Sequence, residues 1–321
     1  MKKIILCLTL TILLLTATAC APSSSEDMSV LNIAVLRGPT GISAAWLMEQ
    51  AENGQANYTF HLADNPEQVV ALLANGTVNL AAVPSNLAAS LYTKMERSIQ
   101  MTALITRGVL YLLQEGSTVQ SWDDLRGHTI YATGRGANPE YILHHLLLEH
   151  GLQPGLDVKV EFKNDHAELA TLLTTGQVGI AMLPEPFVTS ALTQNDNLSI
   201  VFDLSAEWKA LGTGELAMTA LVSQKDFIAG NPQIIAAFLT DMEKSVNYAL
   251  SNVAETAALC EKHDIIPKAA VAERAIPRCN LTFISGKDMQ GTIAAYYDVL
   301  YKANPQSVGG VLPGEDFYYS R

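Results

Sequence analysis

Short apolar runs alternate with longer amphipathic segments along most of the chain. Residues 31–36, 58–62 and 78–83 are short apolar stretches, and each predicts a strand. Between the last two, Asn65 precedes a proline and is typical of a helix start, and Gly76 marks the stop of that helix. Repeated alternation of strands and helices predicts an α/β protein.

The first predicted strand ends in a turn that leaves backbone donors exposed. Arg37, Gly38 and Pro39 break the strand, and a helix is expected to begin near Gly41. Unpaired N–H groups and the positive end of a helix dipole attract an electronegative group of a ligand. Ligands of open α/β sheets bind at the carboxyl ends of strands, where this turn lies. A turn that binds nothing is the alternative.

The chain repeats part of itself at an offset of one hundred residues. The matching residues follow the same order of helix, glycine, strand, proline and helix, which indicates two similarly built lobes. The identical pairs are Leu72/Leu172, Leu73/Leu173, Gly76/Gly176, Val78/Val178, Ala81/Ala181, Pro84/Pro184 and Ser90/Ser190. Chance similarity between two βα units is the alternative.

The opening turn also has a counterpart. A predicted strand at 129–132 is followed by a glycine-containing loop at 133–139, in which Arg135-Gly136 corresponds to Arg37-Gly38. We expect lobe I to comprise 30–107 and 226–321, and lobe II to comprise 108–225. Two crossings between the lobes allow a hinge and a cleft that closes on a ligand.

The N-terminus resembles the leader of a bacterial lipoprotein. Lys2 and Lys3 precede an apolar run at 4–15, which is too short to span a bilayer comfortably, and small residues lead to Cys20. This pattern predicts a signal peptide at 1–19, lipidation of Cys20, and a tether at 20–29. Lipid chains would hold the protein at the membrane on its extracytoplasmic face.

The charge balance narrows the range of partners. The chain has 20 Lys and Arg against 32 Asp and Glu, so a nucleic-acid partner is not expected, because phosphate binding requires a basic face.

Cys260 and Cys279 form an even pair in an exported domain and predict a disulfide, with two buried thiols as the alternative.

Taken together, these features resemble the solute-binding proteins of ABC importers, within them the nitrate/sulfonate/taurine and thiamine-precursor group. The resemblance rests on the lipoprotein leader, the paired lobes, and the segments 36–41, 183–187 and 218–225. It implies a two-lobe periplasmic-binding-protein fold (type II), in which a mixed sheet flanked by helices forms each lobe. It also implies a monomer that delivers a small solute to a membrane permease served by a separate ATPase, with no cofactor.

Candidate ligand-binding residues lie in the loops of both lobes, at the predicted strand ends and near the second crossing. Each could instead cap a helix, shape a turn or carry a surface charge. They are Arg37, Gly38, Pro39, Thr40, Gly41, Ser85, Asn86, Thr133, Arg135, Gly136, Ala137, Asn138, Glu185 and Thr213.

An enzyme on the same fold is a competing hypothesis, acting on a small carboxylate or pyrimidine, and a ligand sensor is another. The sequence has no Ser-His-Asp order or Cys-His pairing that supports an enzyme, and it lacks the cysteine-rich motif of related yeast pyrimidine synthases. His144 and His145 point to different faces of a helix, so no metal site is expected there. Sulfonate, nitrate, a carboxylate and a thiamine-type pyrimidine all remain open as the solute.

Overall fold

The computed structural model describes residues 30–320. The expected signal peptide at 1–19, the tether at 20–29 and the lipidated Cys20 lie outside this range. From Leu31 onward the described residues form one unit. Within it, no helix combines the length and apolar character that crossing a membrane requires.

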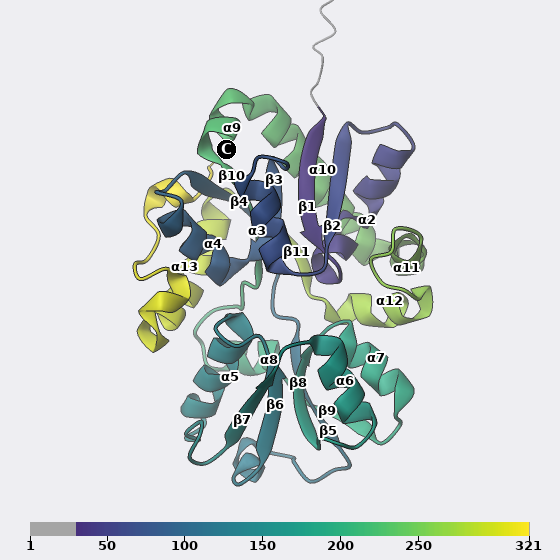
Figure 1. The fold of residues 1–321 in the computed structure, drawn as a ribbon, viewed down its shortest axis with the longest axis vertical. Coiled ribbons are helices and arrows are strands. Elements are labelled where there is room, and N and C mark those ends of the chain that lie inside the picture. Colours follow the sequence, from purple (N-terminus) through teal and green to yellow (C-terminus); the bar gives the residue numbers. More distant parts are fainter. Residues whose placement is uncertain (1–29, 321) are drawn as a thin grey trace, which may run out of the picture. The chain divides into compact units, whose positions relative to one another are not determined.

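The strands form two separate sheets (Figure 1). The first has six strands in the order β11-β4-β10-β3-β1-β2, and β1 runs parallel to both β2 and β3. We call the body built on this sheet the first lobe. Its strands are β1 (Leu31–Leu36), β2 (Tyr58–Ala63), β3 (Leu80–Pro84), β4 (Ile99–Thr106), β10 (Thr219–Gln224) and β11 (Leu281–Ser285).

The second sheet has five strands in the order β7-β6-β8-β5-β9 and forms the core of the second lobe. Here β6 runs parallel to β7 and β8, while β5 is antiparallel to β8 and β9. The order β2-β1-β3-β10-β4 in the first sheet follows the same pattern of directions. The strands are β5 (Leu110–Glu115), β6 (Thr129–Thr133), β7 (Lys159–Lys163), β8 (Ile180–Pro184) and β9 (Leu198–Asp203).

The expected lobe boundary after residue 225 does not match the sheets. Strand β10 pairs with β3 and β4 of the first sheet, although the sequence analysis placed its residues in lobe II. Its apolar side chains would fit the centre of either sheet, so the pattern alone could not choose between them. The chain therefore returns to the first lobe before Thr219.

Helices cover both sheets, and the repeat in the sequence reappears in their starts. Asn65 Oδ1 accepts a hydrogen bond from Gln68 N at 3.0 Å, and Asp165 Oδ1 accepts one from Glu168 N at 2.8 Å. These caps begin α3 and α6, one hundred residues apart. The helices are α2 (Pro39–Glu52), α3 (Pro66–Ala74), α4 (Ser85–Lys94), α5 (Asn138–Glu149), α6 (His166–Thr174), α7 (Phe187–Gln194), α8 (Leu204–Ala210), α9 (Lys225–Gly230), α10 (Pro232–Ser251), α11 (Val253–Lys262), α12 (Ala269–Ala275) and α13 (Gly286–Ala303), with short 3₁₀ turns η1 (Trp122–Leu125), η2 (Ile276–Arg278), η3 (Pro305–Val308) and η4 (Glu315–Phe317).

The predicted disulfide is absent from the structure. Cys260 and Cys279 are free thiols, and both are fully buried in an apolar cluster with side chains of α2 and α10. Burial raises the pKa of the Cys260 thiol to about 12 and that of Cys279 well above its ordinary value. Because oxidation proceeds through the thiolate, this environment disfavours it, and both side chains pack as small apolar groups.

Candidate functional site

The carboxyl ends of the two sheets meet through hydrogen bonds, and we call this region the interlobe seam. Asn138, at the start of α5 in the second lobe, reaches the first lobe. Its Nδ2 donates to Ser85 Oγ at 3.3 Å and to the Met218 carbonyl at 3.2 Å. Ser85 begins α4, directly after β3, and its hydroxyl also donates to the Ala217 carbonyl. Two predicted site residues, Ser85 and Asn138, are thus brought together.

A second contact across the interlobe seam joins Glu185 to Arg278, which was not among the predicted site residues. Glu185 follows β8 and is 1% exposed, and its carboxylate lies 2.5 Å from Arg278 Nε of the first lobe. The same carboxylate accepts hydrogen bonds from Thr189 N at 3.1 Å and from Thr189 Oγ1 at 2.9 Å. Arg278 stands in a 3₁₀ turn next to a proline, and no motif in the sequence pointed to it.

Burial and neighbouring groups shift the pKa of the Glu185 carboxyl in opposite directions. Burial raises its pKa, because the charged form loses its hydration. The Arg278 guanidinium and the hydrogen bonds from Thr189 act in the opposite direction and lower it. The raised pKa that results indicates that the ion pair compensates only part of the cost of burial.

The loop after β1 is held mainly by its own contacts. Arg37 forms ion pairs with Asp64 at 2.7 Å and Asp264 at 2.9 Å, and its pKa is raised, mainly by the hydrogen bond with Asp264. The Thr40 hydroxyl accepts from Leu36 N at 2.8 Å and donates to Leu36 O at 2.9 Å. The side chains expected to meet a ligand here therefore already have partners.

The glycines of this loop have separate roles. Gly38 adopts φ +90° before Pro39, the first residue of α2, and a Cβ there would lie 3.5 Å from Pro186 Cδ of the second lobe. Gly41 faces inward, where a Cβ would lie 2.7 Å from Ile265 Cγ2. The helix begins two residues earlier than predicted, and only Gly38 of this pair faces the interlobe seam.

Polar groups in the corresponding loop of the second lobe also have partners within that lobe. The Thr133 hydroxyl lies 2.6 Å from His166 Nδ1, and Gly136 N donates to Glu140 Oε2 at 2.5 Å. The exposed Arg135 side chain lies over the Phe162 ring, with 5.4 Å from Cζ to the ring centre. Ala137 precedes α5 as its cap residue, without a side-chain hydrogen bond.

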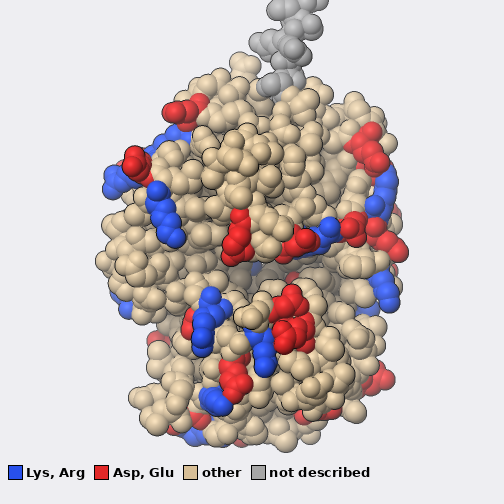
Figure 2. Space-filling view, in the orientation of Figure 1, with Lys and Arg blue, Asp and Glu red and all other residues tan. Residues whose placement is uncertain are grey.

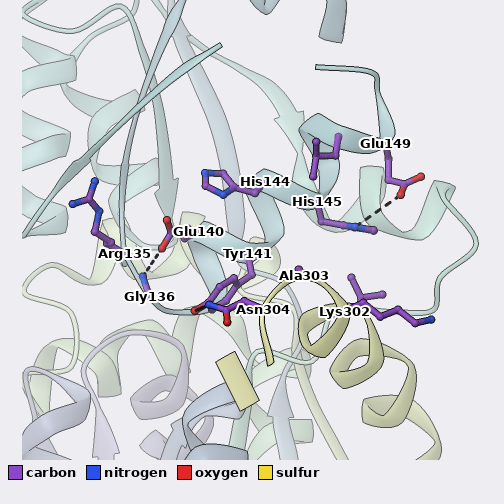
Figure 3. Close-up of a pocket in the computed structure, with 12 residues that line it drawn as sticks. Arg135, Gly136, Glu140, Tyr141, His144, His145, Glu149, Lys302, Ala303 and Asn304 are labelled. Carbon is purple, nitrogen blue, oxygen red and sulfur yellow. Dashed lines mark hydrogen bonds and ion pairs between the residues drawn. The ribbon is translucent and has the colours of Figure 1, made fainter. Parts of the chain in front are cut away.

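A cavity of about 850 Å³ lies between α5 and the end of α13, next to this loop (Figure 3). Burial lowers the pKa of both His144 and His145, which favours neutral imidazoles, and His145 Nδ1 lies 4.0 Å from Glu149. Acidic, basic and neutral polar groups share the wall. The lining residues are Arg135, Gly136, Glu140, Tyr141, His144, His145, Leu148, Glu149, Val299, Lys302, Ala303 and Asn304.

Several buried polar atoms at and near the interlobe seam have no hydrogen-bond partner within residues 30–320. Asn86 and Asn138 each leave their Oδ1 atom unpaired. His145 Nε2, Trp208 Nε1 and Tyr296 OH are also unpaired, and these three rings are adjacent, with centres 4.7 and 5.6 Å apart. Thr213 Oγ1, another predicted site atom, is likewise unpaired. Such atoms can receive hydrogen bonds from, or donate them to, a bound molecule.

The described residues contain one cluster with metal-ligand chemistry, formed by Glu49, Glu52 and His263. The Lys262 ammonium group lies 2.5 Å from Glu49 and 2.8 Å from Glu52, so its one positive charge pairs with both carboxylates. His263 Nε2 lies 3.1 Å from Glu49. The cluster is therefore an ion-pair network of the first lobe, formed between α2 and the end of α11.

The visible face of the molecule carries acidic and basic side chains in a mixed band where the two lobes approach each other (Figure 2). No large surface of one sign appears on this face. On this face, electrostatic recognition would therefore depend on local groups rather than on a broad field of one sign.

A model of the family described as NMT1/THI5 like matches residues 59–256. A structure of an ABC transporter from Parabacteroides distasonis is 25% identical, covers 91% of this chain and 99% of its own, and has a TM-score of 0.78. The periplasmic aliphatic sulphonate binding protein SsuA from Escherichia coli is 16% identical, with coverage of 90% and 92% and a TM-score of 0.69.

A Candida albicans protein described as having the generic periplasmic binding protein fold is 12% identical, with coverage of 90% and 93% and a TM-score of 0.59. A search of curated proteins gave no match. The structural similarities confirm the predicted periplasmic-binding-protein fold, with two mixed sheets flanked by helices.

Proposed function

Because this chain belongs to the NMT1/THI5-like family, we propose that it is an extracytoplasmic solute-binding protein of an ABC importer. It binds a small organic solute between its lobes and presents it to a membrane permease that a separate ATPase drives. It acts by binding, without chemical conversion of the solute. The family match and the similarity to ABC-transporter and sulphonate-binding structures support this role.

The observation that carries the proposal is the pair of hydrogen-bonded contacts across the interlobe seam. Asn138 bonds to Ser85 and Met218 on one side, and Glu185 bonds to Arg278 on the other. A solute that touches both lobes binds the closed arrangement better than an open one, and this difference in affinity drives closure. The lobes would be 30–107 with 218–321, and 108–217, since Met218 N donates to the Thr106 carbonyl of the first lobe.

The binding residues of this proposal are those at the interlobe seam. Gly38 in the loop after β1, and Asn86 and Asn138 in the first turns of α4 and α5, would face the solute. Ser85, Glu185 and Arg278 would hold the two lobes together. The adjoining cavity between α5 and α13 offers room for part of a solute at its Arg135 and Gly136 end. Thr133 acts through its bond with His166, and Thr213 lines the crossing to the first lobe.

Membrane attachment belongs to the same proposal. Cleavage before Cys20 and lipidation of its sulfur would leave 20–29 as a tether to the folded unit. More than one acyl chain anchors a protein stably, whereas a single chain binds a membrane only marginally. The tether would then keep the binding lobes within reach of the permease.

Native protein purified from its own membrane tests the function. It is to be unfolded, and the released small molecules are to be identified by mass spectrometry. The identified solute should then reduce the radius of gyration of ligand-free protein in small-angle scattering and should be recovered unchanged. A protein that releases no solute, or that converts the solute into a product, would contradict the proposal.

A further inference from the structure

Three side chains with metal-ligating groups meet where α11 packs against α2 in the first lobe (Figure 1). Glu49 and Glu52 stand three residues apart in α2, so both carboxylates lie on one face of that helix. His263 directly follows α11. One carboxylate oxygen of each glutamate and one ring nitrogen of His263 lie within 4.8 Å of one another. The packing of the two helices thus assembles a set of ligands that neither helix holds alone.

The Lys262 ammonium group already fills the position of a cation in this cluster. Its Nζ atom lies 2.5 Å from Glu49 Oε2 and 2.8 Å from Glu52 Oε2. The same Glu49 oxygen lies 3.1 Å from His263 Nε2. One ammonium charge faces two carboxylate charges, so these three charged side chains leave one negative charge unbalanced. A divalent cation at the same position would balance both carboxylates.

Two helix ends add to the negative potential at this position. Glu49 and Glu52 lie in the last turn of α2, and His263 is the C-cap residue of α11. The C-terminal end of a helix carries a partial negative charge, so it favours a cation and disfavours a carboxylate. The α2 dipole therefore disfavours the two glutamates, whereas a cation held between the two helix ends is favoured by both dipoles and both carboxylates.

The other contacts of the cluster suit an exchange of cations. Asn53 Nδ2 donates to Glu49 Oε1 at 3.1 Å, which holds this carboxylate with Oε2 directed at the cation. The Glu49 and His263 side chains are 23% and 15% exposed, whereas that of Lys262 is 46% exposed. Because the lysine has a flexible four-carbon stem, its ammonium group can turn into solvent while the ligands stay in place.

The ligand atoms select among divalent cations. Magnesium and calcium prefer sites made of oxygen ligands alone, whereas zinc readily combines an imidazole nitrogen with carboxylate oxygens. Three protein ligands also leave a coordination position for water. We infer that Glu49, Glu52 and His263 form a zinc-type site, which the metal enters by displacing the Lys262 ammonium group. The inference does not depend on the proposed solute-binding function.

A metal ion at this site would hold the end of α11 near the turn that follows β1. Asp264 directly follows His263, and its carboxylate lies 2.9 Å from Arg37 Nη1. The next residue, Ile265, packs so closely on Gly41 that a Cβ there would lie 2.7 Å from Ile265 Cγ2. A cation bound to both glutamates and to His263 would therefore tie α11 to α2 and stabilise the segment that packs on this turn. Because the folded chain alone assembles the site, zinc should raise the melting temperature.

Calorimetric titration of the chelator-treated full chain with zinc chloride tests the inference. Lys262→Met removes the competing ammonium group and keeps a long flexible side chain, so zinc should bind about tenfold tighter or more. Glu49→Gln and His263→Gln each remove one ligand and should weaken zinc binding about tenfold or more. Magnesium chloride should show no binding at concentrations at which zinc saturates the unmodified chain.

Two control variants separate this site from other zinc-binding groups of the chain. His128→Gln changes an exposed histidine of the second lobe and should leave the zinc affinity unchanged. Lys244→Met removes a surface ammonium group that pairs with Asp241, and it should not tighten zinc binding. Thermal unfolding without zinc checks that each variant folds, and added zinc should raise the melting temperature of Lys262→Met more than that of the unmodified chain.

Equal zinc affinity in Lys262→Met and the unmodified chain would overturn the inference, because the ammonium group would then not compete with the metal. Unchanged affinity in Glu49→Gln or His263→Gln would also overturn it, since zinc would then bind elsewhere on the chain. No zinc binding in Lys262→Met would exclude the site outright. These measurements do not involve release of a solute, so the proposed function is judged by its own experiment.

Discussion

The Arg278 guanidinium of the first lobe lies 2.5 Å from the Glu185 carboxylate of the second lobe, and the two sheets are thereby linked through a buried charge. Tyr111 of β5 reinforces this link, since its hydroxyl donates to the Arg278 carbonyl at 3.0 Å. The Arg278 side chain is 32% exposed, whereas that of Glu185 is fully buried. Loss of Arg278 would therefore leave the Glu185 carboxylate buried without a cation.

Arg278→Met should destabilise the protein. Glu185 would remain buried without its cation, and its pKa would rise further. Because Arg278 is partly exposed and solvent screens the pair, we expect a loss of about 1–3 kcal/mol in the free energy of unfolding at neutral pH. Urea denaturation measures the change.

A double variant tests whether the unpaired Glu185 charge causes this loss of stability. Glu185→Gln combined with Arg278→Met should recover most of the loss, because no buried charge is left unpaired. Arg126→Ala is the control, since Arg126 pairs with Asp157 at the surface. A loss in Arg278→Met no greater than in Arg126→Ala would contradict the role of the Glu185 charge.

Stability should fall as the pH is lowered below about 6.5. Burial lowers the pKa values of His144, His145 and His166 in the folded protein, so the unfolded chain binds more protons in this range. The stabilisation is present above the unfolded value of 6.5 and is lost as the pH falls through the folded values. Denaturation curves between pH 8 and pH 5 measure it.

His166 should contribute to this pH dependence. Its Nδ1 lies 2.6 Å from the Thr133 hydroxyl, and His166→Gln should reduce the slope of stability against pH below about 6.5. The exposed His128, changed to Gln, is the control and should leave the slope nearly unchanged. An unaltered slope in His166→Gln would exclude His166 as a source.

Two glycine substitutions should have opposite effects. Gly41→Ala places a methyl group 2.7 Å from Ile265 Cγ2 and should cost about 1–3 kcal/mol by overpacking. Gly291→Ala, inside α13 with no neighbour within 4 Å, should stabilise by about 0.5–1 kcal/mol through helix propensity. Thermal unfolding of both variants measures the effects, and equal shifts of one sign would contradict the packing described here.

Arg37→Ala should change solute affinity less than about threefold, because its guanidinium is committed to Asp64 and Asp264. Stability should change by less than about 1 kcal/mol, since these ion pairs lie at the surface. Calorimetry with the released solute measures the affinity. A tenfold loss would instead return Arg37 to the binding site, as the sequence analysis expected.

Much of the architecture could be predicted from local patterns. Asn65 and Asp165 start equivalent helices, and the constant offset of one hundred residues reappears as matching strands β3 and β8. Helix caps, helix-ending glycines and apolar runs depend on residues close in sequence, so they can be recognised from the sequence alone. The family could be identified for the same reason, from the order of these segments.

Long-range pairing was decided only by the tertiary structure. The 219–224 strand could have completed either sheet, and its pairing with β3 and β4 depended on where the chain crossed back. Cys260 and Cys279 suited a disulfide by number alone, but in the structure they are free thiols in buried apolar surroundings. A cysteine count contains no information about either environment.

The candidate site, too, could be predicted only in part from the sequence. The sequence by itself predicted that Ser85 and Glu185 follow strands and that Asn138 precedes a helix, because strands, turns and helix starts are encoded locally. Only the folded chain determined that Arg278 neutralises Glu185 and that Asn138 bonds to Ser85. These partners are 93 and 53 residues apart, and a hydrogen bond across such separations depends on how the lobes meet.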